Sequence, residues 1–192
     1  MTSIGKNSTT QPEKTLASRL KASSIISVVF VMGVISLVLL FLVVRFALTL
    51  KPFRVVGSAM SPTITNQDMV FTSRDVNDLQ RGDIIIFHHP RNPSDDYLMR
   101  LIALPGETIS IDETGQLFIN DELQREPYIA TENSLLPVIV PKQTLEANHY
   151  WVMGDNRDNS NDSRNWGSVT RETIVSKVVW RYWPPAKFGG ID

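Results

Sequence analysis

The feature that most limits the fold is an uncharged, apolar stretch near the N-terminus, residues 22–44. A helix of this length can cross the roughly 30 Å of hydrocarbon in a bilayer. A cleaved signal peptide is the alternative, but its apolar core is shorter and a small-residue cleavage site follows it. Here Arg45 and a further apolar segment, residues 46–50, come next. We therefore predict an uncleaved transmembrane anchor over residues 22–44.

The segments around this anchor suggest the order of the domains. Residues 1–21 are polar, rich in Ser and Thr, and we interpret them as a disordered tail. Their basic residues favour a cytoplasmic N-terminus and place the rest of a single-pass protein on the outer side, although Arg45, Lys51 and Arg54 work against this orientation. We expect a β domain over residues 45–185 and a frayed C-terminal tail over residues 186–192.

The region after the anchor has the pattern of an all-β domain. Short β-like runs recur every ten to fifteen residues with turns between them, which predicts a mostly β fold of barrel or sandwich type. The run at residues 137–141 is bounded by proline and is predicted to be an edge strand. Residues 170–174 suggest a single helical turn. The expected strands are 55–56, 69–71, 83–87, 98–104, 108–111, 116–120, 137–141, 150–153 and 175–183.

Composition excludes several classes of function. The 19 basic and 20 acidic residues nearly cancel, so the sequence does not suggest a nucleic-acid partner. There is no Cys, which excludes disulfides, thiolate metal sites and a Cys nucleophile. With only three His, a His-rich metal site is not expected, and we predict no metal and no cofactor.

A polar run, Gly154 to Trp166, is held between two apolar, aromatic arms. It contains three Asp, two Arg, two Ser and four Asn, and such residues often form ordinary turns. The strand-like flanks indicate that it is ordered, and buried Asp and Arg must then pair. From the residues alone, a structural salt-bridged turn and the wall of a catalytic site both remain open.

The motif Gly-Asp-Asn-Arg-(x)2-Ser-x-Asp-Ser-Arg, starting at Gly154, resembles the last box of the type I signal peptidases. These membrane-bound endopeptidases use a Ser/Lys dyad to remove signal peptides from secretory preproteins. Other boxes of the family follow in the right order, and the resemblance covers residues 22 to about 185. It implies the same cytoplasmic N-terminus, a signal-peptidase-like β domain on the outer side of the membrane, and no cofactor.

The nucleophile box of the family resembles residues 55–64, but the nucleophile is missing. When the family pattern Gly-x-Ser-Met-x-Pro-Thr is aligned on Met60, Pro62 and Thr63, its serine falls on Ala59. Gly57 and a neighbouring backbone N–H can still form an oxyanion hole, which needs no particular side chain. Ser58 and Ser61 lie beside the aligned position and remain candidates for a displaced nucleophile, although a one-residue shift in a β segment turns a side chain to the other face.

The general-base box resembles residues 97–107, and its lysine position is occupied by Met99, beside Arg100. In the family, burial deprotonates this lysine so that it can accept the serine proton. Methionine has a similar length but cannot take a proton. The ER and archaeal relatives use His here, whereas His88 and His89 lie ten residues earlier and are interpreted as a strand-end pair.

The third box is intact. By resemblance, Ser160 hydrogen-bonds the lysine amine, Asp162 and Arg164 form an ion pair that shapes the site wall, and Asp155 and Arg157 brace the turn. As a mutually satisfied charge network this box has a structural role even without chemistry, because removing one partner of a buried pair costs about 3–5 kcal/mol.

Both catalytic positions therefore carry inert residues of similar size, a pattern that suggests inactivation by evolution or by an experimenter. We expect little or no peptidase activity from this chain.

One hypothesis is a signal peptidase in inactivated form, which binds signal peptides with small residues at the −1 and −3 positions. A second is a non-catalytic peptide-binding or assembly factor at the membrane surface, and a third is a membrane-anchored β domain of unknown role. A peptide would add as a strand along a groove edge, and Met60 with its apolar neighbours is expected to contact lipid.

Overall fold

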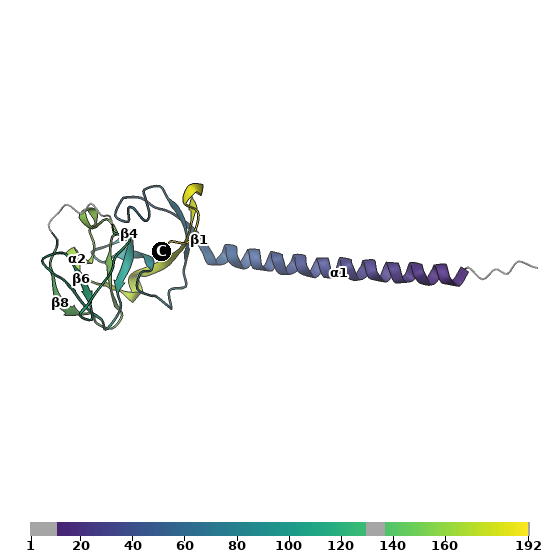
Figure 1. The fold of residues 1–192 in the computed structure, drawn as a ribbon, viewed down its shortest axis with the longest axis horizontal. Helices are drawn as coiled ribbons and strands as arrows, with labels where there is room; N and C mark the ends of the chain where they lie inside the picture. The colour runs from purple at the N-terminus through teal and green to yellow at the C-terminus, as the bar shows by residue number, and fades with distance from the viewer. Residues whose placement is uncertain (1–10, 130–136, 192) are drawn as a thin grey trace, which may run out of the picture. The chain divides into compact units, whose positions relative to one another are not determined.

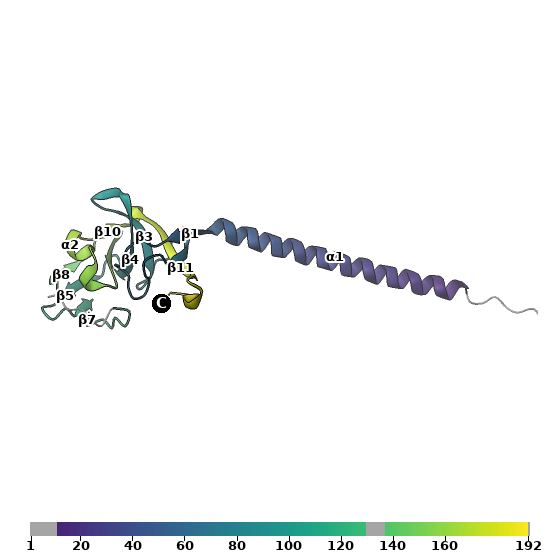
Figure 2. The same ribbon diagram turned by 90° about the horizontal axis from the view of Figure 1, so that it is seen from above.

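The computed structural model describes residues 11–129 and 137–191, which form two units. The first is a single helix, α1 (Gln11–Thr49), and the second is the β unit that starts at Thr49 (Figures 1 and 2). Residues 27–46 of α1 are long and apolar enough to cross a membrane, with a mean hydropathy of 3.0. This span covers most of the anchor predicted at residues 22–44 and continues past Arg45.

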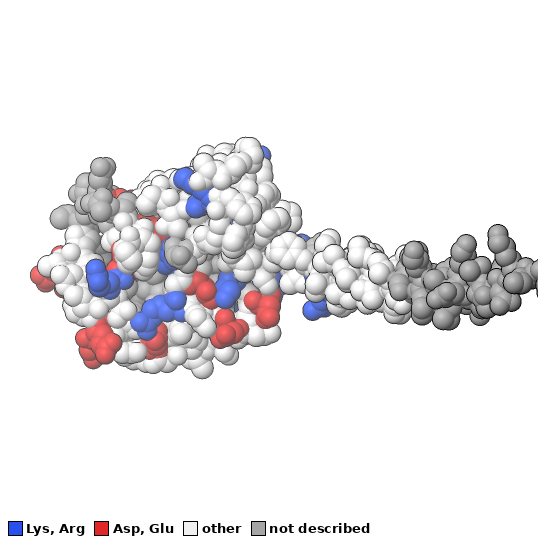
Figure 3. All heavy atoms as spheres, turned by 45° about the vertical axis from the view of Figure 1, so that its right-hand side comes forward, with Lys and Arg blue, Asp and Glu red and all other residues white. Residues whose placement is uncertain are grey.

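The helix begins earlier than the sequence suggested. Residues 11–21, interpreted as part of a disordered tail, belong to α1, while residues 1–10 of that tail lie outside the described residues. Figure 3 shows the described part of α1 as an almost uncharged surface, whereas basic and acidic side chains are interspersed on the visible face of the β unit.

The β unit is built from two open antiparallel sheets. This confirms the predicted mostly β fold. Of the two predicted types, the sheets form the sandwich-like one and not a closed barrel. The seven-stranded sheet has the order β1-β2-β11-β3-β4-β9-β10, and the four-stranded sheet has the order β7-β6-β5-β8. The strands are β1 (Leu50–Arg54), β2 (Met69–Ser73), β3 (Ile84–His89), β4 (Asn92–Ala103), β5 (Thr108–Ile111), β6 (Leu117–Ile119), β7 (Glu122–Leu123), β8 (Val140–Thr144), β9 (His149–Met153), β10 (Val169–Thr170) and β11 (Ile174–Trp183).

Four short helical segments complete the described elements, three of them before β11. They are η1 (Arg157–Asn159) and α2 (Ser163–Trp166), both inside the polar run, and η2 (Arg171–Thr173), the helical turn predicted at residues 170–174. A further turn, η3 (Pro185–Lys187), follows β11.

Three buried clusters form the core. One lies between the sheets and joins Ile102 and Met153 of the large sheet to Ile109 and Ile119 of the small one. The second surrounds Met99, and the third contains Val55, Met60 and Ile64. Burying each such side chain contributes about 1.5–3 kcal/mol relative to exposure.

Several predicted boundaries are wrong, for identifiable reasons. The first strand is β1, not residues 55–56: Val55 exchanges backbone hydrogen bonds with residues 67 and 68, and Gly57, with a φ of 107°, turns the chain away. The edge strand predicted at residues 137–141 is β8, shifted to Val140–Thr144, and it is indeed at the edge of its sheet. β7 and β10 are only two residues long and gave no sequence signal.

The C-terminal segment is ordered as far as Ile191, contrary to the expectation of a frayed tail; Asp192 lies outside the described residues. Gly189 pairs with Arg181 of β11 through two backbone hydrogen bonds of 2.9 and 3.1 Å. Arg181 also donates from Nε to the Lys187 carbonyl at 2.8 Å, and Ile191 packs against the third core cluster. The chain therefore folds back along β11.

Candidate active site

Two chain segments line a cavity of about 350 Å³, here called the first cavity. Residues 53–57 form one wall and residues 96–99 the other, with Ala59, Met60 and Asn161 completing the lining. The structure thus brings Ala59 and Met99, the two positions aligned with the catalytic dyad, to one cavity. Of the described residues that line it, none is Lys or His.

Met99 lies on the buried half of β4, opposite Ile85 of β3, and is 1% exposed. It packs in the second core cluster with Phe87 and Leu101. Burial this complete lowers the pKa of an amine, but the thioether of Met99 has no proton to exchange. The side chain at this position therefore fills space and supplies no acid or base.

The backbone at Ala59 is fixed by asparagines of the polar run. Asn156 donates its backbone N–H to the Ala59 carbonyl at 2.9 Å and its side-chain Nδ2 to the Ser58 carbonyl at 3.3 Å. Asn159 Nδ2 donates to Ser58 Oγ at 2.8 Å, on an exposed side chain. Ser58 therefore points toward the polar run and is hydrogen-bonded there, and it does not line the first cavity. Ser61 is half-buried and also lies outside the lining.

The other residues of the nucleophile box have clear structural roles. The Gly57 N–H donates to Asn66 Oδ1 at 3.2 Å, so this expected oxyanion-hole donor is already engaged. The Thr63 carbonyl accepts from Arg181 at 2.6 Å, and Pro62 is exposed. Met60 is 2% exposed in the third core cluster, so the expectation that it contacts lipid is wrong.

His88 and His89, considered as a replacement base, do not line the first cavity. His88 pairs with Asp96 at 2.8 Å on the exposed β3–β4 hairpin. His89 is buried between the rings of Tyr97 and Trp166, with centroid distances of 4.7 and 5.4 Å. Both therefore belong to the end of the hairpin, as a strand-end pair.

A buried ion pair joins the polar run to β4. Arg100 donates from Nε and Nη2 to the two carboxylate oxygens of Asp155 at 2.9 and 2.8 Å, and from Nη1 to the Gly82 carbonyl at 2.9 Å. Both side chains are almost fully buried, at 3% and 1% exposed. Such bidentate pairs are strong and directional. Asp155 thus pairs outside its own run, with the neighbour of Met99.

Arg157 also finds its partner outside the polar run. Its Nη1 donates to Glu126 Oε2 at 2.9 Å, its Nη2 donates to Glu126 Oε1, and its Nε reaches the Gly154 carbonyl at 3.2 Å. Burial lowers the pKa of Arg157, but hydrogen bonds and charge from Glu126 outweigh this and raise the pKa overall. Burial, together with Glu126, raises the pKa of Tyr128.

Asp162 and Arg164 form the ion pair that the resemblance implied. Arg164 donates from Nε to Asp162 Oδ1 at 2.8 Å and from Nη2 to Oδ2 at 2.9 Å. Asp162 is fully buried, caps α2 and also accepts the Gly154 N–H at 3.1 Å. The last box is therefore a self-consistent hydrogen-bonded wall.

Ser160 is the one polar group of this wall without a partner among the described residues: its Oγ is buried and makes no hydrogen bond. A Cβ built on Gly154 would lie 2.4 Å from Ser160 Oγ and 2.5 Å from the Ala59 carbonyl oxygen. The hydroxyl therefore lies close to the Ala59 backbone. An unsatisfied buried hydroxyl is costly, and an amine in the position of the Met99 side chain is the partner that the resemblance implies.

Sequence reasoning missed Glu126 and Tyr128. The Tyr128 hydroxyl donates to Glu126 Oε1 at 2.9 Å, and the Arg100 guanidinium lies 4.0 Å from the Tyr128 ring centroid. Together they link Arg100 to Arg157. The available signal was indirect: a buried Arg157 needs a carboxylate, but the sequence does not show that this carboxylate is Glu126, which lies 31 residues earlier.

The comparisons with known proteins agree on one family. A model described as signal peptidase, peptidase S26, matches residues 25–183. Signal peptidase I of Pseudomonas aeruginosa is 28% identical over 80% of this chain and 72% of its own length. Signal peptidase IB of Staphylococcus aureus is 31% identical over 80% of this chain and 87% of its own length. A crystal structure of a signal peptidase I from Enterococcus faecalis is 30% identical, with a TM-score of 0.46, covering 54% of this chain and 98% of that one.

The β unit, with its apolar N-terminal helix and this match along most of the chain, belongs to the signal peptidase family, peptidase S26.

Replacing Asp155 with Ala should lower the free energy of unfolding by about 3–5 kcal/mol, because it leaves the Arg100 charge buried without its partner. Denaturant unfolding followed by Trp fluorescence measures this. The matched control is Lys142→Ala, which removes an exposed pair with Asp121 and should cost less than about 1 kcal/mol. Equal losses from the two variants would contradict the assigned importance of the buried pair.

Gly154→Ala should destabilise the β unit by about 1–3 kcal/mol, since the added Cβ meets Ser160 and the Ala59 backbone. Gly190→Ala is the control, because a Cβ there meets no atom within 4 Å. Thermal unfolding of both variants compares them directly. A Gly154→Ala protein as stable as Gly190→Ala would show that the turn does not lie against residue 59 as described.

Proposed function

We propose that this protein binds the signal peptides of secretory preproteins in the first cavity and does not hydrolyse them. The observation that carries the proposal is that Ala59 and Met99 line the same cavity while the walls around them are complete. The family of the chain acts on preproteins at a membrane, and its fold supplies the binding groove. Neither residue at the two aligned positions has an atom able to attack a carbonyl or to accept a proton.

The segments that line the cavity suit an extended peptide. Its two walls, residues 53–57 and 96–99, are extended segments, and extended ligands bind such walls by adding main-chain hydrogen bonds. Apolar side chains, including Val55, Leu98 and Met99, line it and suit small apolar residues at alternate positions of the peptide. The charged residues of the lining are Arg54 and Asp96, one on each wall.

A catalytic role through a displaced serine has less support. Ser58 Oγ accepts a hydrogen bond from Asn159, and none of the residues lining the first cavity is a Lys or His that could take its proton. Serine nucleophiles depend on an adjacent base. We therefore propose that this chain binds signal peptides, and that only a variant with the dyad restored hydrolyses them.

In our proposal the protein is anchored by α1 with its N-terminus in the cytoplasm, so that the β unit meets preproteins on the outer side. Basic residues before the apolar stretch favour this orientation.

The β unit also touches the lipid through exposed aromatic residues of its C-terminal part. Trp180, Trp183 and Phe188 are 41%, 52% and 65% exposed. Trp is enriched at membrane interfaces because its ring is apolar and its N–H is polar.

Restoring the dyad tests the proposal most simply. The double variant Ala59→Ser with Met99→Lys should cleave a preprotein in detergent at least about a thousandfold faster than the unaltered chain, because nucleophile and base act as a unit. Each single variant should remain slow for the same reason. Cleavage by the unaltered chain would refute the proposal and direct attention to Ser58 and Ser61. A folded double variant that stays inactive would argue for a groove no longer suited to signal peptides.

A vesicle flotation assay tests the lipid contact. The β unit alone, residues 49–192, should float with phospholipid vesicles, and replacing Trp180, Trp183 and Phe188 with Ser should abolish flotation. Leu123 and Ile139 are both 56% exposed, so their Ser variants control for the loss of apolar surface in general. If the control variants lose flotation as well, the contact is not specific to the aromatic residues.

A further inference from the structure

The segment after β11, residues 185–191, folds back along that strand and is fastened to it by Arg181; it is here called the return segment. Two backbone hydrogen bonds between Arg181 and Gly189 pair the segment with the strand, and Arg181 Nε donates to the Lys187 carbonyl at 2.8 Å. Further along, Ile191 is half-buried and packs against the third core cluster. The return segment is therefore held at two points, by hydrogen bonds and by apolar packing.

The same arginine also holds the turn that carries Ala59. Arg181 Nη1 donates to the Thr63 carbonyl at 2.6 Å and to Asp68 Oδ2 at 3.2 Å. The Asp68 side chain is 4% exposed, and its backbone carbonyl accepts the Val55 N–H at 2.9 Å. Hydrogen bonds between charged groups are strong and directional. One side chain thus joins the return segment to the turn between Val55 and Asp68, which lines the first cavity.

The third core cluster also connects the return segment to the first cavity. Among the described residues, four apolar members of this cluster line the cavity as well: Phe53, Val55, Met60 and Leu98. Ile191 packs against the same cluster but is not among the described residues of the lining. Buried side chains are close-packed, so a large peptide side chain that presses on the lining enters only if the cluster gives way. Ile191 can therefore act on the cavity as a positioning residue, through its neighbours.

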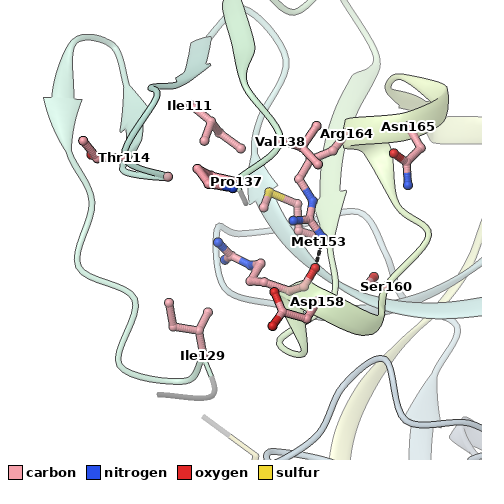
Figure 4. Close-up of a pocket in the computed structure, with 12 residues that line it drawn as sticks. Ile111, Thr114, Ile129, Pro137, Val138, Met153, Asp158, Ser160, Arg164 and Asn165 are labelled. Carbon is pink, nitrogen blue, oxygen red and sulfur yellow. Dashed lines mark hydrogen bonds between the residues drawn. The ribbon is translucent and has the colours of Figure 1, made fainter. Parts of the chain in front are cut away.

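A second cavity, of about 430 Å³, has no such connection. Ile111 and Val138 lie on one side of it, and Asp158 and Ser160 of the polar run lie on the other (Figure 4). None of the described residues that line it belongs to the third core cluster or lines the first cavity. Ile111 belongs instead to the cluster between the two sheets. It is a buried isoleucine beside a different cavity, which makes it a matched control for Ile191.

We propose that the return segment, through Ile191 and Arg181, sets the size of the peptide side chain that the first cavity accepts. This inference rests on the proposed function, which places a signal peptide in that cavity. With the segment in place, Val55 and Met60 are backed by a packed cluster, and forcing a large side chain against them strains it. With the Ile191 side chain shortened, the cluster loses packing and yields to a larger side chain.

Three labelled peptides test this with the full-length protein in detergent by fluorescence anisotropy. All end at the last residue of a signal peptide; one has Ala at the −1 and −3 positions, and each of the others has Leu at one of them. The unaltered chain should bind the Ala peptide at least about tenfold more tightly than one or both Leu peptides. Ile191→Ala should reduce that preference to about threefold or less. The ratio is the readout because a smaller folded fraction weakens all three affinities equally.

Three further variants separate positioning from general stability. Ile111→Ala removes the same atoms from a residue that is 4% exposed in another cluster, and it should keep the full preference. Ile191→Val is a conservative change and should keep most of it. Arg181→Lys retains a charge opposite Asp68 but lacks the planar fork that reaches several acceptors at once, so it should weaken the preference as Ile191→Ala does.

The outcomes separate this inference from the proposed function. A preference that survives both Ile191→Ala and Arg181→Lys, or that Ile111→Ala removes equally, would overturn the inference and leave the proposed function intact. An unaltered chain that binds all three peptides equally well would also overturn it, because there is then no size selection to set. If folded protein binds none of the peptides, the proposed function fails and this inference fails with it.

Discussion

The buried ion pair between Arg100 and Asp155 is the interaction on which the site depends. It ties β4, which carries Met99, to the polar run, which carries Ser160 and holds the Ala59 backbone through Asn156. Two charges at 3% and 1% exposure are stable only together, because either one alone would remain desolvated without compensation. Glu126 and Tyr128 extend the network to Arg157. The geometry of the cavity is therefore maintained by groups that take no part in hydrolysis.

In our proposal a peptidase scaffold persists without its dyad, and this separation of structural from reacting groups explains how. Ala59 and Met99, at the two positions aligned with the dyad, have no polar side-chain group to desolvate, and Met99 packs in the second core cluster as an ordinary buried residue. The Ser160 hydroxyl is buried without a hydrogen bond among the described residues, which our proposal attributes to the absence of the lysine amine. In our proposal the chemistry is lost while the lining of the first cavity stays in place.

Much of this organisation was predictable from the sequence, because the apolar stretch, the alternating strands and three motifs are local patterns. The Asp162–Arg164 pair, two residues apart, followed from one of them. The partners of Asp155 and Arg157 did not, since Arg100 and Glu126 are distant in sequence and only the sheet topology brings them close. Met60 was misplaced because the exposed apolar surface implied by the family resemblance was assigned to it, whereas the chain packs it beside Val55 and Ile64 in the third core cluster. The C-terminal fold-back depends on Arg181, whose partners cannot be identified from spacing.

The most direct test of binding without cleavage follows one signal peptide with the unaltered protein. The peptide, extended beyond its cleavage position, is titrated in detergent and then examined by mass spectrometry after prolonged incubation. The account predicts saturable binding, competed by unlabelled peptide, with the peptide recovered intact. Recovery of two fragments cut after the signal peptide would contradict the assignment of Ala59 and Met99 as an inert pair. A folded protein that does not bind the peptide would contradict the preserved groove.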